Sequence, residues 1–83
     1  MIFIIQRSMD YCGSKNVAAF TDPVATYNEC LKSENVACIS SDYEALIVQM
    51  FYSSGDNHAV RIKEEHLESY ETFAESLLQH INK

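Results

Sequence analysis

The chain has 83 residues, and its twelve Asp and Glu against six Lys and Arg give a formal net charge of −6. Hydrophobic residues make up 47% of it, which is typical of a folded domain rather than of a disordered acidic tail. The length predicts one domain, residues 1–83. The acidity argues against a direct nucleic-acid binder, because phosphate contacts need clustered Lys and Arg.

The cysteines and the apolar segments indicate a compartment. Three cysteines, Cys12, Cys30 and Cys38, are an odd and sparse set for a disulfide framework. The apolar start at Met1 lacks the basic region of a signal peptide, and no apolar run reaches the length of a membrane span. We therefore expect a reduced, soluble, cytoplasmic protein that does not contact membranes.

The first 20 residues predict an antiparallel hairpin. Residues 1–9 open with five apolar side chains, three of them Ile, as a buried strand does. Residues 10–15 read as a turn in which Gly13 takes a positive φ, and residues 16–20 return as a second strand.

A helix is predicted over residues 23–33. Pro23 suits the first helical position, and Asp22 or Thr21 can supply the cap oxygen. Apolar residues recur at helical spacing at Val24, Tyr27 and Leu31. The short apolar run at residues 36–39 predicts a third strand.

Residues 42–55 allow two interpretations. Ser41 and Glu44 fit a helical capping box, with Gly55 just beyond the helix end. The β-branched and aromatic residues over 46–52, followed by a turn and the alternation over 60–63, instead indicate a hairpin, which we favour. The hairpin would turn five residues to the core: Leu46, Val48, Met50, Val60 and Ile62.

The last 20 residues predict one long helix over 64–83. Its apolar positions are Leu67, Tyr70, Phe73, Ala74, Leu77, Leu78 and Ile81. Together these elements predict a small two-layer α+β domain with a mainly antiparallel sheet, in the order β-β-α-β-β-β-α. Because each helix has one apolar stripe, both should pack on one face of the sheet.

No motif predicts an enzyme, a metal or a cofactor. The cysteines are 18 and 8 residues apart, unlike the close pairs of metal sites, and there is no Gly-rich phosphate loop. We expect Cys30 and Cys38 to be small buried hydrophobes. Cys12, in the predicted turn, supports the less favoured alternative of a small cysteine-dependent enzyme.

The partner-binding residues are predicted from charge and from exposed apolar groups. Five acids occupy the polar side of the C-terminal helix with no Lys or Arg before Lys83: Glu64, Glu65, Glu68, Glu71 and Glu75. Such a stripe is either a solvated face that keeps a small protein soluble or a negative patch that binds a basic surface. Tyr11 in the first loop is a further interface candidate, and Ile47 and Phe51 would lie on the uncovered face of the sheet.

In its size, its acidity and its lack of catalytic motifs, the chain resembles the small accessory proteins encoded by bacteriophages and mobile elements. Some of these inhibit host defence enzymes, including CRISPR complexes, by occupying their basic surfaces. We therefore expect a non-enzymatic protein-binding module, in its most concrete form an inhibitor that covers a nucleic-acid-binding surface. The alternative is a structural homo-oligomer, such as a homodimer, or an accessory subunit that uses an exposed sheet face.

Overall fold

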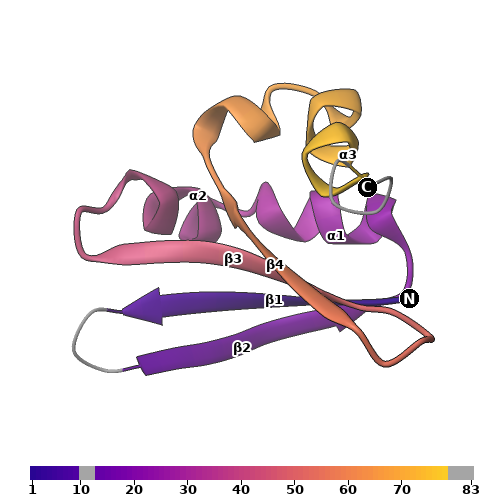
Figure 1. The fold of residues 1–83 in the computed structure, drawn as a ribbon. Coiled ribbons are helices and arrows are strands. Elements are labelled where there is room, and N and C mark those ends of the chain that lie inside the picture. The colour runs from indigo at the N-terminus through magenta and orange to yellow at the C-terminus, as the bar shows by residue number, and fades with distance from the viewer. Residues whose placement is uncertain (10–12, 79–83) are drawn as a thin grey trace.

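The computed structural model describes residues 1–9 and 13–78, which form a four-stranded sheet and a helical layer (Figure 1). The strands are β1 (Ile2–Met9), β2 (Gly13–Phe20), β3 (Glu44–Phe51) and β4 (Asn57–Ile62). The helices are α1 (Pro23–Cys30), α2 (Ser33–Ser40), the 3-10 helix η1 (Glu64–Leu67) and α3 (Tyr70–Leu78). All strand pairs are antiparallel, so the predicted α+β class is confirmed.

The predicted N-terminal hairpin is formed by β1 and β2. β1 also pairs with β3, which gives the strand order β2-β1-β3-β4. β2 begins at Gly13, earlier than the predicted start at residue 16, and the φ of Gly13 is +77°, as expected. The register shifts between Ile5 and Gln6, where Val17 of β2 is the extra residue of a bulge. Residues 10–12 of the predicted turn lie outside the described residues.

The central segment forms the predicted hairpin of β3 and β4 rather than a helix. Across its turn the Tyr52 N–H donates to the Asp56 carbonyl at 2.9 Å, and Gly55 has a φ of +94°. Alternate side chains of both strands point to the helical layer. All five predicted core residues are buried: Leu46, Val48, Met50, Val60 and Ile62.

α1 begins where the sequence predicts, but its buried face agrees only in part with the predicted stripe. The Asp22 side chain accepts a hydrogen bond from the Val24 N–H at 3.0 Å, and a proline follows as the first helical residue. Of the predicted stripe, Tyr27 packs against the core, but Val24 is 46% exposed and Leu31, beyond the helix end, is 43% exposed. The fully buried residues of α1 are Cys30, as predicted, and Thr26, which was not predicted. Thr26 can be buried because its hydroxyl donates to the Asp22 carbonyl at 2.9 Å.

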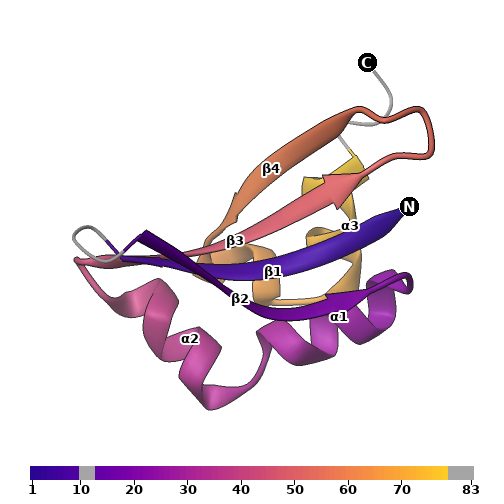
Figure 2. The ribbon, with the colours of Figure 1, turned by 90° about the horizontal axis from the view of Figure 1, so that it is seen from below.

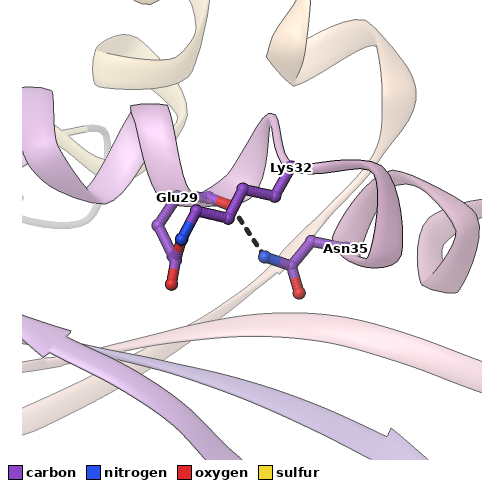
Figure 3. Close-up of polar contacts among 3 residues, drawn as sticks. All are labelled: Glu29, Lys32 and Asn35. Carbon is purple, nitrogen blue, oxygen red and sulfur yellow. Dashed lines mark hydrogen bonds and ion pairs between the residues drawn. The ribbon is translucent and has the colours of Figure 1, made fainter.

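The predicted third strand at residues 36–39 is wrong, because this segment belongs to α2. A run of four apolar residues is too short for its period to distinguish a strand from a helix. In the helix, Asn35 and Cys38 lie three residues apart and are both buried. Asn35 Nδ2 donates to the Glu29 carbonyl at 2.6 Å, which joins α2 to the last turn of α1 (Figure 3).

The predicted continuous helix over residues 64–83 is wrong, because the segment is divided into η1 and α3. Ser69 precedes α3, and its Oγ accepts a hydrogen bond from the Thr72 N–H at 3.1 Å. Ser69 is therefore an N-cap, and a new helix begins after it. Residues 79–83, the predicted end of the helix, lie outside the described residues.

The helices lie on one face of the sheet, as predicted, and no described element covers the other face (Figures 1 and 2). Tyr27 of α1 fastens the C-terminal segment to this layer. Its hydroxyl donates to the Leu67 carbonyl at 3.0 Å, and its ring lies 5.7 Å from that of Tyr70 and 5.2 Å from that of Phe73. Among the residues that the structure describes, eleven form the core between the layers: Phe3, Ile5, Cys30, Cys38, Leu46, Val48, Met50, Val60, Ile62, Phe73 and Leu77.

Candidate functional site

Five carboxylates of η1, α3 and their connection form what we call the acidic surface. Its residues are Glu64, Glu65, Glu68, Glu71 and Glu75, all of them exposed. Because Phe73 and Leu77 of α3 are buried in the core, the other side of this helix faces solvent. The acids therefore stay outside the core as predicted, although they follow two short helices rather than one stripe.

The start of the acidic surface is held by two hydrogen bonds between Lys63 and His66, just after the end of β4. The Lys63 N–H donates to His66 Nδ1 at 3.0 Å, and the His66 N–H donates to the Lys63 carbonyl at 3.0 Å. These two bonds close the turn that begins η1. The Glu64 carboxylate is also oriented, because its Oε1 accepts a hydrogen bond from the Ser40 hydroxyl of α2 at 3.3 Å.

Within residues 1–9 and 13–78, no ion pair compensates the charge of the acidic surface. Residues 64–78 contain five acids and no Lys or Arg. Among the described residues, the ion pair of this structure joins Lys32 Nζ and Glu29 Oε2 at 2.7 Å, elsewhere on the helical layer (Figure 3). Glu71 and Glu75 lie four residues apart on α3, a spacing at which like charges repel by a few tenths of a kcal/mol. A basic partner would relieve this repulsion.

The second candidate surface is the side of the sheet that points away from the helices, which we call the open sheet face. It contains the predicted residues Ile47 and Phe51, both half-buried by their neighbours. Ile2 lies opposite Phe51, and Ile47 lies opposite Gln6 on the adjacent strand. The open sheet face and the acidic surface belong to opposite layers, so the predicted residues do not form a single site.

A row of amides crosses the open sheet face, and no pattern in the sequence points to it. Gln6 Nε2 donates to Asn16 Oδ1 at 2.7 Å, and Gln49 Nε2 donates to Gln6 Oε1 at 3.0 Å. The row spans β2, β1 and β3. Alternation along each strand places these amides outward, but their alignment depends on the strand order and on the bulge, which the sequence alone does not give.

The two described cysteines are buried thiols, as predicted. Burial and, to a smaller extent, the charge of Glu29 raise the pKa of Cys30 to about 12. Burial also raises the pKa of Cys38, and the Glu44 carboxylate adds to the effect. A nucleophilic thiol needs the opposite shift. Cys12 and Tyr11 lie outside the described residues.

No protein-family model, curated protein or solved structure gives a significant match to this sequence. Within residues 1–9 and 13–78, no group of three or more His, Cys, Asp or Glu side chains could hold a metal ion. None of the helices in that part of the chain is long and apolar enough to cross a membrane.

Proposed function

We propose that this chain is a non-enzymatic protein-binding domain whose acidic surface docks on a basic surface of its partner. The observation that carries the proposal is the segment from 64 to 78, which presents five exposed carboxylates and no Lys or Arg. Charge complementarity of this kind raises the rate of encounter and orients the partner.

The negative charge of the acidic surface indicates which kind of protein it binds. Basic surfaces of proteins are concentrated where nucleic acid binds, because phosphates need Lys and Arg. We propose that the acidic surface occupies such a site and acts as an inhibitor of a nucleic-acid-handling complex. The resemblance to phage and mobile-element accessory proteins supports a host defence complex, such as a CRISPR complex, as the target. The free thiols of Cys30 and Cys38 support action in the reducing cytoplasm.

Two charge variants test the acidic surface. One combines Glu71→Lys with Glu75→Lys, and the matched control combines Glu34→Lys with Asp42→Lys at exposed positions of α2 and of the loop that follows it. Each exchange changes the charge by two, so both double variants have a formal net charge of −2 instead of −6. The control therefore separates the position of the charge from its amount.

The assay is affinity capture from a lysate of the native host with each of the three immobilised proteins. We expect the immobilised wild type and the immobilised control to capture a common lysate protein. The variant with Glu71→Lys and Glu75→Lys should not capture it. Added RNA or DNA should release it, and raising the salt from about 0.1 M to about 1 M should weaken it, because the Debye length falls from about 10 Å to about 3 Å. Equal capture by the two double variants would contradict the proposal.

A further inference from the structure

We propose that the open sheet face binds the same face of a second copy of this chain. The centre of this face consists of Ile4 and Gln6 on β1 and of Ile47 and Gln49 on β3. Large apolar side chains on an uncovered sheet are favoured where another surface covers them, because each buried Å² of apolar surface contributes about 25 cal/mol. This interface uses different residues from the acidic surface and does not depend on the proposed function.

The distribution of charge favours a second copy as the occupant. Arg61, on the edge strand β4, is the one charged residue among the outward positions of the four described strands. The acids that give the chain its net charge of −6 lie elsewhere. Two strongly acidic molecules repel each other over most of their surfaces, but they can meet through this nearly neutral face while their acidic surfaces point away from each other.

The amide row allows the polar part of this face to be covered. Burying an amide costs free energy unless its polar atoms are hydrogen-bonded. Asn16, Gln6 and Gln49 already bond to one another at 2.7 and 3.0 Å, so part of their hydrogen-bonding capacity is satisfied before any partner arrives. Lys or Glu at these positions, which are common on solvated sheets, would have to be desolvated as charges.

The area of the face suits a weak dimer. β1, β2 and β3 each contain eight residues. At about 3.3 Å per residue and about 4.8 Å between strands, the four-stranded face measures about 26 by 19 Å, or roughly 500 Å². Two such faces bury roughly 1,000 Å², which is near the lower limit for a specific interface. We therefore expect dimerisation at micromolar to submillimolar concentration rather than an obligate dimer.

Sedimentation equilibrium from about 10 μM to about 1 mM tests this interface. The wild-type average mass should rise towards twice the monomer mass, and Ile47→Lys should weaken the dimer at least tenfold. The matched control is Leu31→Lys, since Leu31 is 43% exposed outside the open sheet face, and this variant should dimerise like the wild type. Ile47→Thr keeps a β-branched residue in the strand, so it should weaken the dimer without loss of folding, which circular dichroism would verify.

NMR spectroscopy tests whether the dimer interface lies on the open sheet face. In NMR spectra, the side-chain amide signals of Gln6, Gln49 and Asn16 should shift with protein concentration, and those signals should stay constant in Ile47→Lys. A wild type that remains monomeric at about 1 mM would overturn the proposal, as would a dimer that Ile47→Lys leaves intact. Capture through the acidic surface uses other variants, so either proposal can fail while the other stands.

Discussion

The buried side chain of Asn35 makes the packing of α2 on α1 testable by a single isosteric substitution. Asn35 is fully buried, and its Nδ2 donates to the Glu29 carbonyl at 2.6 Å (Figure 3). Its Oδ1 is also buried and has no hydrogen-bond partner among the described residues. Asn35→Asp keeps the shape but replaces the donor with an oxygen. At neutral pH this oxygen carries negative charge and faces a carbonyl oxygen.

The expected loss in the free energy of unfolding of Asn35→Asp follows from the burial of residue 35. An uncompensated buried charge destabilises a protein by about 3–5 kcal/mol. A domain of 83 residues has a total stability of about 4–12 kcal/mol, so Asn35→Asp should lose a large part of it at pH 7. When protonated, the new carboxyl can donate to the Glu29 carbonyl, and the cost should fall below about 1 kcal/mol.

The pH dependence has a defined sign. The folded protein raises the pKa of the introduced carboxyl above its unfolded value of about 3.9, because burial disfavours the charged form. The variant should therefore be within about 1 kcal/mol of the wild type below about pH 4 and lose stability as the pH rises. Urea denaturation followed by circular dichroism at about pH 4 and about pH 7 measures the difference between the two proteins at each pH.

Asn28→Asp is the matched control, because Asn28 is exposed on α1 and the change in net charge is the same. It should cost only a few tenths of a kcal/mol, as an acid near a helix C-terminus does. If residues 36–39 formed a strand, Asn35 would not be fixed against α1, and the two substitutions would have similar effects. Equal stabilities of the two variants at pH 7 would therefore refute the arrangement of α1 and α2.

Three further predictions concern the same fold. Leu77→Ala should cost about 2–5 kcal/mol because Leu77 is 2% exposed, whereas Leu78→Ala, at 47% exposure, should cost far less in the same urea titration. Ser69→Ala should cost about 0.5–2 kcal/mol by removing the cap of α3, and Ser69→Asp, which keeps an acceptor, should recover most of it. The raised pKa of Cys30, about 12 against 9.0 for a free thiol, means that its contribution to stability is complete below about pH 9 and is lost as the pH rises through 12. Cys30→Ala should therefore lose less stability than the wild type between about pH 8 and about pH 10, and equal losses would contradict the burial of this thiol.

The parts of the fold that the sequence predicted are those with a repeated local pattern. The second hairpin alternates over β3 and β4, so one face could be assigned to the core, and its turn contains Gly55. The start of α1 combines Asp22 with a proline, two signals that agree. The outward position of the five acids followed from the apolar positions Phe73 and Leu77 on the opposite side of α3.

The parts that the sequence did not predict depend on single tertiary contacts. The helical conformation of α2 depends on Asn35, whose side chain donates to the Glu29 carbonyl of α1. This contact joins two helices, so a pattern within residues 33–40 does not predict it. The buried face of α1 depends on Thr26, which is polar and does not count as a core residue in a hydrophobic pattern. The start of α3 could have been predicted locally, because Ser69 is a good N-cap residue. The apolar residues at helical spacing on both sides of Ser69 instead favoured one continuous helix.

The two proposed surfaces make a joint prediction, because they lie on opposite layers of the domain. A dimer formed through the open sheet face would carry two acidic surfaces, both pointing outward. On a dense array of a basic partner, both can bind at once, and the second contact becomes intramolecular, which raises the apparent affinity by about 10²–10⁴. Dissociation from a partner captured through the acidic surface should therefore be slow at high surface density and fast at low density. Ile47→Lys should remove only this dependence on density, whereas Glu71→Lys with Glu75→Lys should remove binding at both densities. Wild-type dissociation that is equally fast at both densities would show that the two surfaces act separately.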